Sequence, residues 1–191
     1  MRTKLFYFCL STLLCVAFVS DLPAATIDLG SSTSRTPYDR YLGPMFVVFK
    51  DLGGGHPDMA TVEQLVAQGR AFRYSFKKDE PYVPQSPQET ESTKAGDCKA
   101  KSLWLAYKME TSRVRFVVGK AKAVSNMNHA WLIWDGPDGW LILDATLYSR
   151  PLAPQTLSPA QFMPLYSYGP SGKYAHTVAA AAKGQSYGDH M

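Results

Sequence analysis

Three residues of this chain have side chains that together could carry out acyl transfer: Cys98, His129 and Asp144. A thiolate can attack a carbonyl carbon, and an imidazole can take up and return the proton. A carboxylate can fix the tautomer and the orientation of that imidazole. We therefore take the three residues as a candidate catalytic triad that needs no metal or other cofactor. The remaining histidines add no zinc-ligand spacing, so no metal site is predicted.

The position of Cys98 favours a reactive thiol. Residues 97–110 have apolar side chains at helical spacing, and Asp97 is a plausible N-cap after Gly96. Cys98 then lies in the first helical turn, where free backbone N–H groups and the helix dipole stabilise negative charge. A thiolate is favoured at such a position, and the same N–H groups can bind an oxyanion. An inert buried cysteine is the alternative explanation of the same residue.

His129 and Asp144 belong to a predicted β-hairpin. Two apolar runs, 129–134 and 140–143, flank the turn-forming residues 135–139. We expect a four-residue loop over 135–138, because a two-residue loop would place Pro137 where a primed turn needs positive φ. This register puts His129 directly opposite Asp144, with Cβ atoms roughly 4.5–5.5 Å apart. Taken singly, His129 could be an ordinary polar strand residue and Asp144 a turn cap.

The N-terminus has the layout of a secretory signal peptide over residues 1–25. A basic start is followed by the apolar run 5–19 and by small residues, with cleavage expected after Ala24 or Ala25. The run is shorter than the about 20 residues of a membrane span, so we expect no stable membrane insertion after cleavage. The protein is therefore predicted to be periplasmic or secreted. Cys9 and Cys15 leave with the leader, so Cys98 becomes the only thiol of the mature chain.

Length and composition indicate one globular domain over residues 26–191. The 191 residues are 46% hydrophobic and 19% charged. Without the leader, 18 basic and 15 acidic residues remain (20 less Arg2 and Lys4, 16 less Asp21), a net charge of +3. No basic cluster appears, so no nucleic-acid partner is predicted. The ends, about 26–40 and 178–191, are expected to be flexible.

The other elements are less well defined by the pattern. We expect a helix within 59–76, a loop over 77–95 and a strand over 113–118. The segment 166–174 is expected to be a surface loop. The tryptophans at 131, 134 and 140 are expected in the core or in the wall of a groove.

The residues that frame the triad resemble a known family. Gly96-Asp97-Cys98, Asn128-His129-Ala130-Trp131 and Leu143-Asp144-Ala145-Thr146 are similar to motifs of the bacterial transglutaminase-like cysteine proteinases. The segment Pro87–Thr90 and, more loosely, Pro164–His176 extend the resemblance to roughly residues 40–176. It implies an α+β papain-like fold, with the cysteine-bearing helix packed on an antiparallel sheet that carries the histidine and the aspartate. It also implies cleavage of a protein or peptide substrate in the periplasm.

The resemblance fails at two positions that concern a cofactor. The best-known branch of the family releases a surface adhesin and uses calcium, bound by acidic residues just after the cysteine. Lys99 and Ala100 occupy those positions here, and only Asp97 remains acidic nearby. We therefore expect neither calcium dependence nor the adhesin substrate.

The triad leaves several functions open. Hydrolysis of an amide bond by a thioester acyl-enzyme is the leading hypothesis. Transamidation uses the same intermediate, intercepted by an amine, and cleavage of peptidoglycan peptides fits an exported enzyme equally well. A non-catalytic binding module on the same fold is an alternative of another class.

Overall fold

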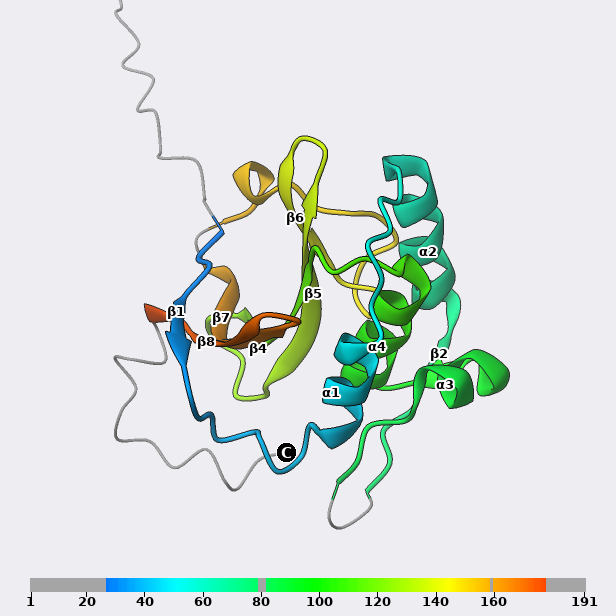
Figure 1. Cartoon of the computed structure of the whole chain (residues 1–191), viewed down its shortest axis with the longest axis horizontal. Coiled ribbons are helices and arrows are strands. Elements are labelled where there is room, and N and C mark those ends of the chain that lie inside the picture. The colour runs from blue at the N-terminus through cyan, green and yellow to red at the C-terminus, as the bar shows by residue number, and fades with distance from the viewer. Residues whose placement is uncertain (1–26, 79–81, 159, 178–191) are drawn as a thin grey trace, which may run out of the picture.

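The computed structural model describes residues 27–78, 82–158 and 160–177, which build an α+β protein (Figure 1). A six-stranded antiparallel sheet has the order β1-β8-β7-β4-β5-β6. The predicted signal peptide and the C-terminal tail lie outside the described residues. Among the helices that the structure describes, none is long and apolar enough to cross a membrane.

The strands of the main sheet are short at its edges and longer at its centre. They are β1 (Ser31–Thr33), β4 (Val114–Lys122), β5 (His129–Gly136), β6 (Gly139–Leu143), β7 (Gln161–Gly169) and β8 (Gly172–Ala175). A separate parallel pair joins β2 (Arg73–Tyr74) to β3 (Ala95–Gly96). The helices are α1 (Gly43–Lys50), α2 (Met59–Ala71), α3 (Pro87–Thr93), α4 (Cys98–Met109) and the 3-10 helix η1 (Pro154–Thr156).

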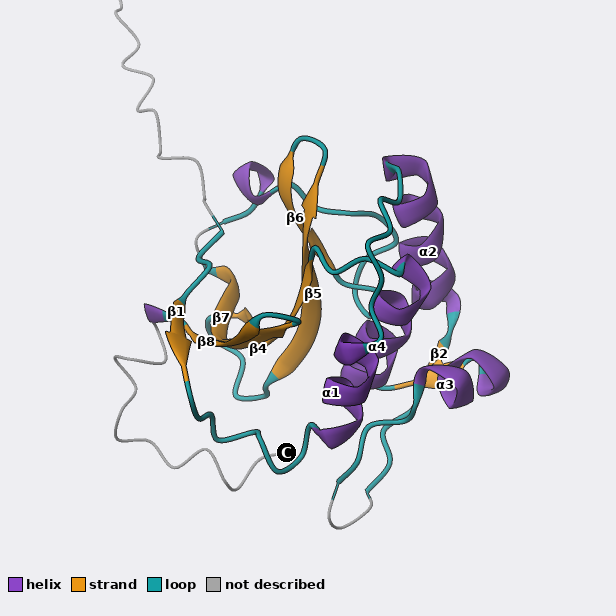
Figure 2. Ribbon diagram, in the orientation of Figure 1, coloured by secondary structure: helices purple, strands orange, loops and turns teal. Residues whose placement is uncertain are grey.

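The four α-helices gather on one side of the sheet, and α4 packs directly against β4 and β5 (Figure 2). Side chains of β5 alternate between two apolar clusters because successive residues of a strand point to opposite faces. Ala130, Leu132 and Trp134 join the larger cluster, to which the helices contribute. Trp131 and Ile133 join a smaller cluster with Val117 and Phe162. Because both faces of β5 are buried, the strand that carries His129 is packed from two sides.

The helix predicted over 97–110 forms as α4. Asp97 is its N-cap, since its side chain accepts hydrogen bonds from Lys99 N and Ala100 N. The helix expected within 59–76 is shorter than that range, because α2 ends at Ala71 and the chain turns into β2. The strand predicted over 113–118 continues to Lys122 as β4.

The predicted register of the β5–β6 hairpin is wrong. Gly136 pairs with Gly139, so the loop contains only Pro137 and Asp138. The expectation of a four-residue loop depended on the argument that a two-residue loop requires a positive φ at Pro137, but in the structure the positive φ belongs to Gly139, at 106°. Glycine adopts this conformation without steric cost. The pairing is therefore shifted by two residues from the prediction, which keeps each side chain on its expected face.

Three segments expected to be irregular contain regular structure. Within 77–95, helix α3 starts from the N-cap Ser86, whose side chain accepts a hydrogen bond from Glu89 N. The expected surface loop 166–174 is most of the β7–β8 hairpin. In the N-terminal segment, predicted to be flexible, β1 pairs with β8. Each segment is rich in Ser, Pro or Gly, which obscures the apolar periodicity on which the prediction depended.

Candidate active site

Cys98 is the first residue of α4 and is buried, with 5% of its surface exposed. Asp97 Oδ1 accepts the N–H groups of Lys99 and Ala100, both at 2.9 Å. The cap thus binds the two N–H groups that follow Cys98 and does not use the N–H of Cys98 itself. This arrangement places a thiol beside a backbone donor at the positive end of a helix dipole.

His129 and Asp144 are hydrogen-bonded to each other. His129 Nε2 donates to Asp144 Oδ2 at 2.8 Å. Asp144 is 1% exposed, and its Oδ1 accepts the N–H groups of Thr146 and Leu147 at 2.9 and 3.1 Å. These bonds fix the carboxylate at the end of β6, so it can orient the imidazole. His129 Nδ1 is left to face another partner.

Cys98 is the other group whose interaction acts on the His129 ring. Burial of the His129 ring opposes its protonation, but hydrogen bonds with Asp144 and Cys98 and the charges of both groups outweigh burial. Together they raise the pKa of His129 to about 10. The structure therefore brings Cys98, His129 and Asp144 into one cluster in which the imidazolium is favoured at neutral pH. That the three residues are catalytic stays a prediction.

Two further side chains, Tyr82 and Lys99, surround the start of α4, and the sequence analysis missed the role of Tyr82. Tyr82 Oη donates to Asp97 Oδ2 at 2.5 Å, and Lys99 Nζ lies 3.5 Å from the same oxygen. The Lys99 ammonium also lies over the Tyr82 ring, 4.5 Å from its centroid. Burial and the neighbouring Asp97 carboxylate raise the pKa of Tyr82 above its usual range. No local pattern links Tyr82 to Asp97, which is 15 residues later in the chain.

Calcium does not fit the residues around Asp97. Calcium prefers six to eight oxygen ligands. Asp97 Oδ1 is occupied by the helix cap and Oδ2 by Tyr82, and the Lys99 ammonium stands beside that oxygen. Within the described part of the chain, no group of three or more His, Cys, Asp or Glu residues could hold a metal ion. The expectation that calcium is not used stays a prediction.

Comparison with solved structures shows which fold this is. The EGTA-treated LapG of Legionella pneumophila superposes with a TM-score of 0.53 at 20% identity, over 70% of this chain and 75% of that one. The calcium-bound form of LapG gives a TM-score of 0.51 at 20% identity, over 76% and 80% of the two chains. The chain has the papain-like fold. This confirms the predicted α+β architecture, with the cysteine-bearing helix on an antiparallel sheet.

The comparisons by sequence give no match. No protein-family profile and no curated protein matches this chain. At 20% identity the likeness to LapG shows the fold alone.

Proposed function

We propose that the protein is an exported cysteine peptidase that hydrolyses an amide bond through a thioester acyl-enzyme. The observation that carries the proposal is the position of His129, which is hydrogen-bonded to Asp144 at 2.8 Å. Its interactions with Asp144 and with Cys98 raise the pKa of the imidazole to about 10. The fold shared with LapG, a transglutaminase-like cysteine protease, supports the same class of chemistry.

In the acylation step, the Cys98 thiolate attacks the carbonyl carbon of the scissile amide. The electron pair of the carbonyl moves onto its oxygen, and the backbone N–H of Cys98 is positioned to stabilise that oxyanion. His129, as the imidazolium, donates its Nδ1 proton to the leaving nitrogen, and the C–N bond breaks. The first product leaves as an amine, and a thioester joins the acyl group to Cys98.

In the deacylation step, neutral His129 takes a proton from water, and the resulting hydroxide attacks the thioester carbonyl. The C–S bond breaks and the Cys98 thiolate returns, again paired with the imidazolium. Asp144 holds the imidazole through Nε2 in both steps, so Nδ1 stays directed at the reacting atoms. No step needs a metal or another cofactor.

The substrate in this proposal is a protein or peptide met outside the cytoplasm. The predicted signal peptide over residues 1–25 supports a periplasmic or secreted location. Transamidation differs only in the nucleophile that reaches the thioester, because an amine then replaces water. Cleavage of peptidoglycan peptides needs the same triad with a different substrate.

Alkylation by iodoacetamide tests the activated nucleophile. We expect the Cys98 peptide, quantified by mass spectrometry, to be alkylated faster in the wild type than in His129→Ala. His56→Ala is the matched control, because His56 is exposed and lies away from the triad in sequence. If the wild type reacts no faster than His129→Ala, the proposed nucleophile is wrong and a binding module becomes the better explanation.

Product analysis separates the possible reactions. Casein and purified peptidoglycan sacculi are incubated with the wild type and with Cys98→Ala. New peptide N-termini in casein support the proposed peptidase. New isopeptide cross-links, or release of soluble peptides from the sacculi alone, overturn it in favour of transamidation or peptidoglycan cleavage.

A further inference from the structure

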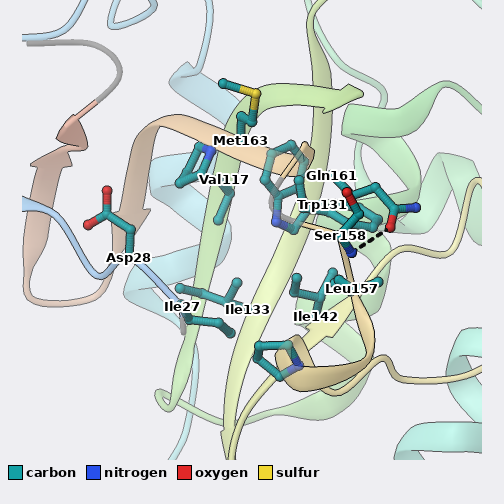
Figure 3. Close-up of a pocket in the computed structure, with 13 residues that line it drawn as sticks. Ile27, Asp28, Val117, Trp131, Ile133, Ile142, Leu157, Ser158, Gln161 and Met163 are labelled. Atoms are coloured by element: carbon teal, nitrogen blue, oxygen red, sulfur yellow. Dashed lines mark hydrogen bonds between the residues drawn. The ribbon is translucent and has the colours of Figure 1, made fainter. Parts of the chain in front are cut away.

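A cavity of about 280 Å³ lies against the smaller apolar cluster, between the strands and the segment that follows η1 (Figure 3). Val117, Trp131, Ile133 and Ile142 of β4, β5 and β6 line it from the sheet. Leu157, just after η1, and Phe162, in β7, also line it. We call this the sheet cavity. The triad does not use it.

The size and lining of the sheet cavity fit a small apolar group. An apolar cavity of about 150 Å³ is known to hold benzene, so about 280 Å³ has room for a two-ring aromatic group or a short alkyl chain. Val117, Trp131 and Ile133 belong to one buried hydrophobic cluster and are each 3% exposed or less, so this part of the lining is mainly apolar. Ser158 and Gln161 also line the cavity, but Ser158 N donates to Gln161 Oε1 at 3.0 Å, and the two largely satisfy each other.

Among the described residues that line the cavity, Asp28 is the only charged one, and it lies at one end of the lining (Figure 3). Its carboxylate accepts the N–H groups of Gly30 and Thr177 at 2.8 and 3.2 Å, and 36% of the side chain is exposed. Burial opposes ionisation, but these bonds and the nearby His176 keep the pKa of Asp28 below its usual value. The carboxylate is therefore charged at neutral pH, which favours a cation and disfavours an anion at this end.

The neighbouring basic groups leave that charge in place. His176 Nδ1 is 3.5 Å from Asp28 Oδ2, but His176 is 1% exposed and burial lowers its pKa, which disfavours a full positive charge on this ring. The guanidinium of Arg115 donates to Leu29 O at 2.7 Å and stacks on Tyr174. Neither side chain lines the cavity.

One residue of the lining also touches the candidate active site. The Trp131 ring stacks on His129, with centroids 6.1 Å apart and planes 24° apart, and packs edge-on against Phe162 at 5.3 Å. A group that enters the sheet cavity therefore contacts the same indole that supports the imidazole.

We propose that the sheet cavity is a ligand site for a small cationic amphiphile, with the ammonium group at Asp28 and the apolar body against Trp131. A ligand bound there changes the surroundings of His129 through the Trp131 ring. The binding part of this inference does not depend on the proposed function, because it concerns residues outside the triad.

Octylamine and octanoate are the probes, since they differ in the sign of the head group and share the same chain length. Binding is measured on the full chain carrying Cys98→Ala, by the NMR shift of the Trp131 indole N–H, assigned with Trp131→Phe. We expect saturable binding of octylamine and at least about tenfold weaker binding of octanoate. Asp28→Asn is expected to reduce this preference to less than about threefold.

Cavity-filling variants locate the site. Val117→Phe and Leu157→Trp are each expected to weaken octylamine binding about tenfold. Leu157 is only partly buried, so its variant still tests the site if Val117→Phe does not fold. The matched control is Val124→Phe, because Val124 is 90% exposed and away from the cavity. Unchanged binding in the two cavity variants, or equal binding of the two probes, overturns the proposal.

A further outcome tests the link to His129. In the wild type, octylamine is expected to change the Cys98 alkylation rate at least about twofold, and an unchanged rate in a protein that binds the probe overturns the link to His129. If octylamine does not bind the Cys98→Ala protein, only the inference about the sheet cavity is wrong. If Cys98 is alkylated no faster in the wild type than in His129→Ala, the proposed peptidase is wrong.

Discussion

His129 and Asp144 are hydrogen-bonded across the β5–β6 hairpin from positions that are diagonal to each other. The last observed pair is Leu132 with Leu143, so continuing the register would place Trp131 opposite Asp144. Diagonal side chains of an antiparallel pair still lie within reach when they are long. The contact therefore forms in a register that differs from the predicted one, and Trp131 is left to support the imidazole ring.

The first prediction concerns the proton on His129. Asp144→Asn removes the carboxylate charge that helps to raise the pKa of His129 to about 10. We expect the wild-type imidazolium to persist through neutral pH and to be lost only as pH rises through about 10. In Asp144→Asn the loss moves to lower pH, toward the ordinary value of about 6.5. NMR of the His129 ring signals between about pH 5 and about 11 measures both transitions.

His56 provides the internal control for that titration, because it is exposed and remote from Asp144 in sequence. The chemical shifts of its ring should not differ between the two proteins at any pH of the series. An identical midpoint for His129 in wild type and Asp144→Asn would show that Asp144 does not set the charge of the imidazole.

The parts of this site that depend on neighbouring residues in the sequence could be predicted, and the parts that depend on tertiary packing could not. The cap and start of α4 depend on Asp97 and the next three residues, so they were predicted correctly. The hairpin was predicted, but its register was not. The register depends on which residue adopts a positive φ, and that residue is Gly139, just after the loop. The bond between Tyr82 and Asp97, the stacking of Trp131 on His129 and the sheet cavity depend on tertiary packing. Apolar periodicity carries no information on such contacts.

The second prediction is that chelation of calcium leaves the protein unchanged. The Lys99 ammonium lies beside the Asp97 carboxylate, and its positive charge repels a calcium ion from that carboxylate. We expect the melting temperature and the Cys98 alkylation rate to be the same in excess EGTA and in excess calcium. A calcium-dependent rise in melting temperature would contradict this reading of Lys99.

The third prediction concerns the support of the helix cap. Tyr82→Phe removes the hydroxyl that donates to the buried Asp97 carboxylate. A hydrogen bond to a charged group contributes about 1.5–3 kcal/mol, so we expect the free energy of unfolding in urea to fall by about that amount. Tyr107→Phe is the matched control, because Tyr107 is 42% exposed and on the far part of α4. Equal losses in the two variants would mean that the Asp97 contact contributes nothing specific.

The fourth prediction tests how the sheet positions His129. Gly119 pairs with His129 across β4 and β5, next to the register shift that follows Val118. A Cβ at this position would overlap the carbonyl oxygen of Met163 and would lie 2.8 Å from the Trp131 ring. Since neither neighbour can retreat without moving a strand or the ring beneath the imidazole, Gly119→Ala is expected to lower the free energy of unfolding by about 1–3 kcal/mol.

The same substitution should slow Cys98 alkylation at temperatures where the variant remains folded, because displacement of Trp131 displaces His129. Gly43→Ala is the control: a Cβ there meets no atom within 4 Å, so its unfolding free energy should stay within about 0.5 kcal/mol of wild type. Urea denaturation and peptide mapping of alkylated Cys98 measure the two effects separately. A Gly119→Ala protein that is destabilised but keeps wild-type alkylation would show that the Trp131 ring does not position the imidazole.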